Sequence, residues 1–114
     1  MDIRFHTHAT QADTALADHA RRRLQLQFLH LSDRVSYIAV KFGDTGSRRG
    51  RRDAYCSVRV QLGGVPAATV VDVGADAYDT IDRAADRVGR LVKEQLRTVD
   101  TGRRRGARLA DTAA

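Results

Sequence analysis

One long amphipathic stretch, from Asp76 to Val99, restricts the folds open to this chain more than any other feature. Its apolar residues recur at spacings of three and four, so they form a single stripe on a helix of about six turns. They are Tyr78, Ile81, Ala85, Val88, Leu91, Val92, Leu96 and Val99. Asp76 is placed to cap the first free backbone N–H groups. Gly89 costs this helix about 1 kcal/mol relative to alanine, unless a neighbouring element comes close there.

Alternating segments before this helix predict a sheet. Apolar and polar residues alternate, as in strands, over residues 2–8, 35–42, 54–62 and 65–73. A second helix is predicted from Thr14 to His30, with Asp13 as its N-cap. Since this helix joins the first two strands, those strands should be parallel if they are adjacent.

Turn residues fix the remaining connections. Gly63 and Gly64 indicate a tight hairpin, and Pro66 favours an edge position for the last strand, because proline has no N–H for the ladder. The predicted order is β-α-β-β-β-α. This order is typical of an α+β fold in which both helices cover one face of a four-stranded, mostly antiparallel sheet.

The length of 114 residues suits one domain. We expect an α+β domain over residues 1–99, followed by a basic tail over 100–114 that is disordered in solution. Residues 43–53 contain three glycines and four arginines and no apolar side chain, so they predict a mobile surface loop. The single cysteine, Cys56, excludes an internal disulfide and favours a reducing cytoplasmic setting. The sequence shows no signal peptide and no apolar run long enough for a membrane span.

The net charge points to a class of partner. The chain has 20 Lys and Arg residues against 14 Asp and Glu, a formal charge of +6, and 18 of the 20 are arginine. Because arginine grips phosphate through two N–H groups and stacks on bases, this composition favours a nucleic-acid partner. An arginine-rich genome bias is the alternative. The long helix carries equal numbers of acids and bases over 76–97, so the excess lies mostly elsewhere.

Residue types that enzymes use are present, but they do not occur in the sequence arrangements that catalysis requires. The serines lack a nucleophile-elbow context, and Cys56 should be buried and inert. The glycines of 43–50 lack the Gly-Lys-Ser/Thr ending of a phosphate loop. His6 and His8 share one strand face and could share a metal, although exposed or RNA-facing histidines are the simpler interpretation. We therefore expect no catalytic residue, no metal, no cofactor and no small-molecule substrate.

Basic side chains are the remaining candidates for a functional site. Arg23 on the first helix could align with Arg87, Arg90 and Lys93 on the long helix, where the two outer surfaces meet. Arg22 and Arg83 are neighbouring candidates. An auxiliary basic loop contributes Arg48, Arg49, Arg51 and Arg52, and further arginines follow in the tail. Together these residues could span a phosphate-lined groove, although charged outer faces are usually just solvated.

The long helix also resembles a known family. The run Asp76-Ala-Tyr78-Asp-Thr-Ile81-Asp82, with Asp86-Arg87-Val88 and Arg90 after it, is similar to the signature of ribosome hibernation-promoting factors and ribosome-associated inhibitors. These are proteins of the protein Y type, also known as sigma-54 modulation proteins. The similarity extends over most of residues 2–98 and is closest to the short members, which lack a second domain.

The resemblance implies a specific function. It implies the same β-α-β-β-β-α fold and a cytoplasmic stress or stationary-phase protein that inhibits translation. Such a protein would bind the decoding region of the 30S ribosomal subunit and contact 16S rRNA through Arg23, Arg87, Arg90 and Lys93. We expect a monomer that does not bind membranes. Two alternatives remain open: a protein-interaction module that uses an exposed sheet face, and a general RNA-binding domain of the double-stranded type.

Overall fold

The computed structural model describes residues 1–6, 11–44 and 53–113, and their side chains at 1–6, 14–44 and 53–102. The elements follow the predicted order. They are β1 (Ile3–Phe5), α1 (Gln11–Gln27), β2 (Val35–Asp44), β3 (Ala54–Leu62), β4 (Val65–Gly74) and α2 (Ala77–Ala113). The predicted α+β class is confirmed.

The four strands form one sheet in the order β1-β2-β3-β4. β1 runs parallel to β2, as the crossover through α1 requires, and the other neighbours are antiparallel. Gly64 has a φ of +70° in the turn between β3 and β4, which confirms the hairpin. β4 lies at the edge, where Pro66 is tolerated.

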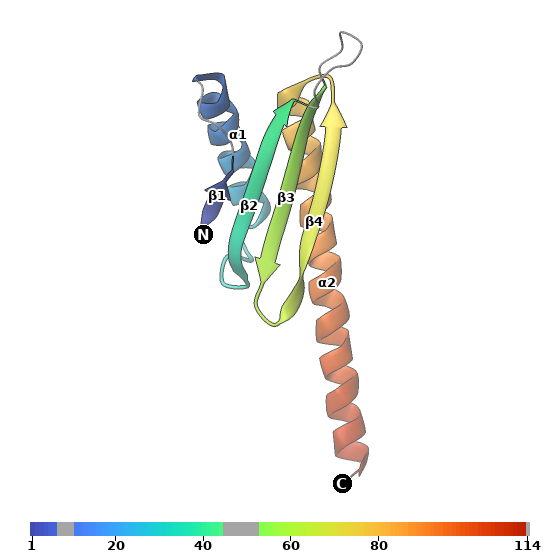
Figure 1. The fold of residues 1–114 in the computed structure, drawn as a ribbon. Helices are drawn as coiled ribbons and strands as arrows, with labels where there is room; N and C mark the ends of the chain where they lie inside the picture. The colour runs from blue at the N-terminus through green and yellow to red at the C-terminus, as the bar shows by residue number, and fades with distance from the viewer. Residues whose placement is uncertain (7–10, 45–52, 114) are drawn as a thin grey trace.

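Both helices lie on the same face of the sheet, and the opposite face is open (Figure 1). The core fills the space between these two layers, with side chains from both helices and from the inner face of β2, β3 and β4. Phe28, Ile38, Val60, Val88 and Val92 are completely buried there. The apolar stripe predicted for the long helix therefore packs in the core, except for Tyr78 at its start, which is exposed.

The ends of the helices differ from the predicted ends. α1 begins at Gln11, so Asp13 lies inside the helix and is not its N-cap. It ends at Gln27 instead of His30, because short turns follow in which the Leu31 N–H donates to the Phe28 carbonyl. These turns keep Phe28 in the core while they redirect the chain into β2.

α2 is longer than the sequence predicts. The Asp76 carboxylate accepts a 3.0 Å hydrogen bond from the Asp79 N–H, so the predicted N-cap is confirmed. The helix then continues beyond Val99 to Ala113, where the sequence predicts a disordered tail, and it projects past the end of the sheet (Figure 1). The division into a domain at 1–99 and a tail at 100–114 stays a prediction.

The ends of the strands agree with the predicted ends more closely than those of the helices do, except at the amino terminus. β1 ends at Phe5 instead of residue 8, although the His6 N–H still donates to the Val40 carbonyl at 3.0 Å. The predicted loop 43–53 begins two residues later, because β2 includes Gly43 and Asp44. His8 and most of that loop lie outside the described residues.

Gly89 marks the place where the two helices approach closely. A Cβ atom added there would collide with the side chain of Gln27 on α1. The glycine therefore stabilises the packing of α1 on α2, which offsets its low helix propensity.

No helix in the described part of the chain is both long enough and apolar enough to span a membrane.

Candidate nucleic-acid interface

The first segment of α2, residues 77–87, pairs two of its acids with α1. The Arg23 guanidinium lies 3.1 Å from Asp82 and 3.0 Å from Asp86, and the ring of His19 lies 2.7 Å from the same Asp82 carboxylate. The two helices run in the same direction, so residues one turn apart on α1 meet residues one turn apart on α2. Arg23 is consequently held in ion pairs between the helices.

Arg83 and Arg87 turn the other way, toward β4. Asp72 lies 3.5 Å from the Arg83 Nε and 3.2 Å from the Arg87 Nη1, and only 14% of its side chain is exposed. The same arginines donate to backbone carbonyls at the sheet edge, Arg87 to Val71 at 3.0 Å and Arg83 to Val73 at 3.3 Å. They close part of an open strand edge.

The geometry therefore does not bring Arg23 and Arg87 together as the sequence predicts. Arg23 contacts Asp82 and Asp86, whereas Arg87 contacts Asp72 on the opposite side of α2. The charges of the first segment of α2 are therefore paired with neighbouring elements, the two acids with α1 and the two arginines with β4.

Residues 88–99, the second segment of α2, carry exposed cations. Arg90, Lys93 and Arg97 are exposed and form no ion pair with any described residue. Together with Glu94 they line a shallow hollow on the helix surface. Their spacings of three and four place them on one stripe about 10 Å long. We call Arg90, Lys93 and Arg97 the α2 basic patch.

The other predicted site residues are placed as follows. Arg22 is exposed on α1 and donates to the Asp18 carbonyl at 3.5 Å, so its charge faces solvent. Arg48, Arg49, Arg51 and Arg52 lie outside the described residues. The roles of all these residues in RNA binding stay predictions.

Two residues that matter for the site were missed in the sequence. His19 lies edge-on to Tyr78 and contacts Asp82, although the pattern of the first helix indicates neither partner. The sequence pattern places Asp72 only within the last strand, at the edge of the sheet. Its neighbours in the strand point outward, and it lies opposite Cys56 on β3. The alternation of side chains along the strand therefore places the Asp72 carboxylate on the inner face of the sheet. A buried carboxylate needs a cationic partner, and that requirement is the signal that could have identified Arg83 and Arg87.

Cys56 is buried, as predicted. Burial, aided by the negative charge of Asp72, raises the pKa of its thiol from 9.0 to about 12. The reactive thiolate is therefore scarce at neutral pH.

Within residues 1–6, 11–44 and 53–113, no cluster of three or more His, Cys, Asp or Glu side chains is suited to hold a metal ion. His6 is exposed at the end of β1, and its predicted companion His8 lies outside the described part.

Solved structures share this fold. A ribosomal subunit interface protein from Coxiella burnetii superposes with a TM-score of 0.63 at 17% sequence identity, over 82% of this chain and 96% of that one. The N-terminal domain of Thermus thermophilus protein Y superposes with a TM-score of 0.58 at 22% identity, over 82% of this chain and 98% of that one. At these identities the likeness establishes the fold.

No protein-family model matches the sequence, and no curated protein matches it significantly.

Proposed function

We propose that this chain is a non-enzymatic ribosome-binding protein that inhibits translation during stress. It would bind the decoding region of the 30S subunit through 16S rRNA, as a cytoplasmic monomer, and exclude mRNA and tRNA. Two observations support this proposal: the fold is shared with a ribosomal subunit interface protein and with protein Y, and α2 resembles the hibernation-factor signature.

The α2 basic patch is the observation that carries the proposal. Arg90, Lys93 and Arg97 are exposed and form no ion pair with a described residue, so phosphate oxygens can replace water around them without breaking an internal ion pair. Each such contact releases counterions from the RNA, which makes binding strongly dependent on salt.

The paired arginines have a different role in this proposal. For Arg23 to bind a phosphate it must leave Asp82 and Asp86, and Arg87 must leave Asp72. We infer that Arg23, Arg83 and Arg87 hold α2 in position, while the α2 basic patch supplies most of the affinity.

The test compares two matched variants on one helix. Arg90→Gln/Lys93→Gln and Arg83→Gln/Arg87→Gln each remove two positive charges. We expect the first variant to lose about tenfold or more in affinity for 30S subunits and to show a shallower salt dependence. The second should retain most of its affinity but lose about 1 kcal/mol of stability. Co-sedimentation over a salt series and thermal unfolding measure the two effects.

Two results would contradict the proposal. One is wild-type protein that fails to co-sediment with 30S subunits at low salt. The other is an equal loss of affinity in both variants, because net charge alone would then explain binding. Competition with duplex RNA separates the general double-stranded RNA binder from a ribosome-specific protein, since only the former would be displaced by any duplex.

A further inference from the structure

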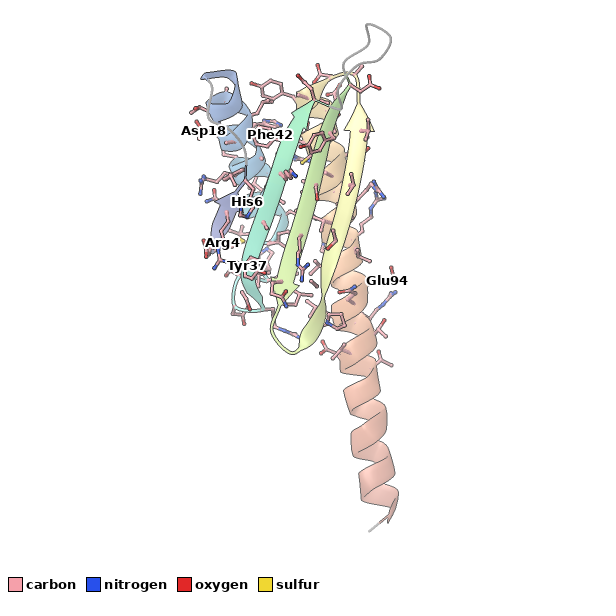
Figure 2. All side chains as sticks on the ribbon, in the orientation of Figure 1. Arg4, His6, Asp18, Tyr37, Phe42 and Glu94 are labelled. Carbon is pink, nitrogen blue, oxygen red and sulfur yellow. The ribbon has the colours of Figure 1, made fainter. Side chains whose placement is uncertain are left out.

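The sheet face turned away from the helices carries a second group of basic and aromatic side chains. Figure 2 looks onto this face, with Arg4, His6 and Tyr37 labelled on its β1 and β2 side. Lys41, Tyr55 and Arg59 occupy further outward positions on β2 and β3. We call these six residues the outer-face cluster.

Strand register sets the spacing of the cations. Arg4 lies opposite Ala39, and Ala39 lies opposite Arg59, so the two arginines flank a small residue in one row across three strands. Because neighbouring strands are about 4.8 Å apart, the backbones of Arg4 and Arg59 lie about 10 Å apart. Lys41 follows two residues after Ala39 on the same face. The three cations therefore lie around Ala39 on the outer face of the sheet.

Aromatic rings lie near both ends of β2, Tyr37 on β2 itself and Tyr55 on β3. The Arg4 guanidinium stacks 4.2 Å from the centre of the Tyr37 ring, which places two flat groups against each other. At the other end, Tyr55 packs on Gly43, where a Cβ atom would come within 3.2 Å of the ring. Tyr37 and Tyr55 are half-buried, so each ring is braced by the sheet.

Acids are rare on this face. Two acidic residues are described within the strands, Asp44 and Asp72. They lie opposite Ala54 and Cys56, at positions that alternate with the outward-facing ones. Asp2 precedes β1 and pairs with Arg4 at 2.9 Å. The exposed Val71 and Val73 lie opposite Ser57 and Tyr55, at the β4 edge of this face. The charge therefore fits an anionic partner better than an apolar protein surface.

We propose that the outer-face cluster binds single-stranded RNA, with phosphates on Lys41 and Arg59 and bases stacked at Tyr55 and at the Arg4–Tyr37 pair. An open sheet with aromatic side chains is a suitable platform for unpaired bases, because every base has a flat face to stack. The inference does not depend on ribosome binding. If both proposals hold, the chain contacts RNA on two opposite faces.

The first test measures anisotropy of a fluorescein-labelled, ten-nucleotide single-stranded RNA of mixed sequence, with two charge-matched variants of the full chain. Lys41→Glu/Arg59→Glu alters the outer face, and Arg90→Glu/Lys93→Glu alters the α2 basic patch by the same charge. We expect the outer-face variant to bind the RNA at least tenfold more weakly and the helix variant to lose less than threefold. An equal loss in both variants, or a larger loss in the helix variant, would overturn the inference.

A second test separates base stacking from charge attraction. An abasic oligonucleotide of the same length carries the phosphates without the bases. We expect the wild-type chain to bind it about tenfold more weakly than the RNA. In a Tyr78→Phe background only Tyr37 and Tyr55 fluoresce, and RNA with bases should quench them. Equal affinity for both oligonucleotides, or binding without quenching, would overturn the inference.

Two controls keep the result interpretable. Circular dichroism checks that the glutamate variants fold, and Arg59→Gln replaces the double variant if they do not, with a smaller loss of RNA affinity expected. Sedimentation equilibrium tests for a second copy as the occupant: a wild-type dimer that Lys41→Glu/Arg59→Glu abolishes would overturn the RNA assignment. Retained RNA binding by Arg90→Glu/Lys93→Glu, with 30S binding lost, would show the two proposals to be independent.

Discussion

The two segments of α2, residues 77–87 and 88–99, both carry acidic and basic residues but differ in how these charges are used. In the first segment, Asp82 and Asp86 pair with α1, and Arg83 and Arg87 pair with Asp72 on β4. In the second segment, the α2 basic patch faces solvent. The number of charges is therefore a poor guide to a binding surface, because what matters is whether each charge already has a partner within the fold.

The largest effect should come from the buried thiol beside Asp72. The pKa of Cys56 is about 12 in the folded chain against 9.0 when exposed, so the folded state holds its proton longer. The stability that this difference provides is complete below pH 9 and declines as the pH rises toward 12. We expect a loss of about 2 kcal/mol between pH 9 and 10.5.

Chemical denaturation across that pH range measures this loss, and Cys56→Ala is the control that removes the titrating group. Identical pH slopes for the wild type and Cys56→Ala would show that the thiol is not held neutral by the fold.

A smaller effect is expected when the first segment of α2 loses its acidic partner on β4. Asp72→Asn retains an acceptor for the Val73 N–H but removes the counter-charge of Arg83 and Arg87. We expect about 1 kcal/mol of destabilisation. Glu94→Gln is the matched control in the second segment, where no ion pair is lost among the described residues, and it should stay within about 0.5 kcal/mol of the wild type. Equal destabilisation of both variants in urea unfolding would remove the distinction between the two segments.

The smallest change should make the first segment of α2 behave like the second. Asp82→Asn/Asp86→Asn frees Arg23 and His19 from their carboxylates. Because these pairs are partly exposed, the stability loss should be about 0.5 kcal/mol. The released arginine should tighten 30S binding about threefold at low salt, as measured by co-sedimentation. Unchanged or weaker binding would show that Arg23 does not lie near the RNA.

Local patterns were sufficient to predict most of the fold. The apolar spacing of α2, the alternation of β3 and the two glycines before β4 each specify structure within about ten residues, and all three predictions were confirmed. The close approach at Gly89 was also foreseen as the condition that would justify a glycine there. The helix ends were not, because the turn after Gln27 and the extension to Ala113 depend on more than periodicity.

The candidate site could be predicted only as a list of residue types. The partner of His19 lies 63 residues away in the sequence, and so does one partner of Arg23, Asp86. Nothing in the local sequence decides whether Arg87 meets Asp72 or an RNA phosphate. The sequence identified the basic residues, whereas the packing of α1 and β4 on α2 determines which of them remain available.

The contacts of Arg83 and Arg87 with the β4 carbonyls have a consequence for self-association. The groups that close this edge come from α2, so the edge is protected only while the helix is docked. A partly unfolded chain with α2 detached would present a strand rich in valine and open to pairing with another copy. Docking of α2 is thus the folding step that protects this protein from aggregation at high concentration.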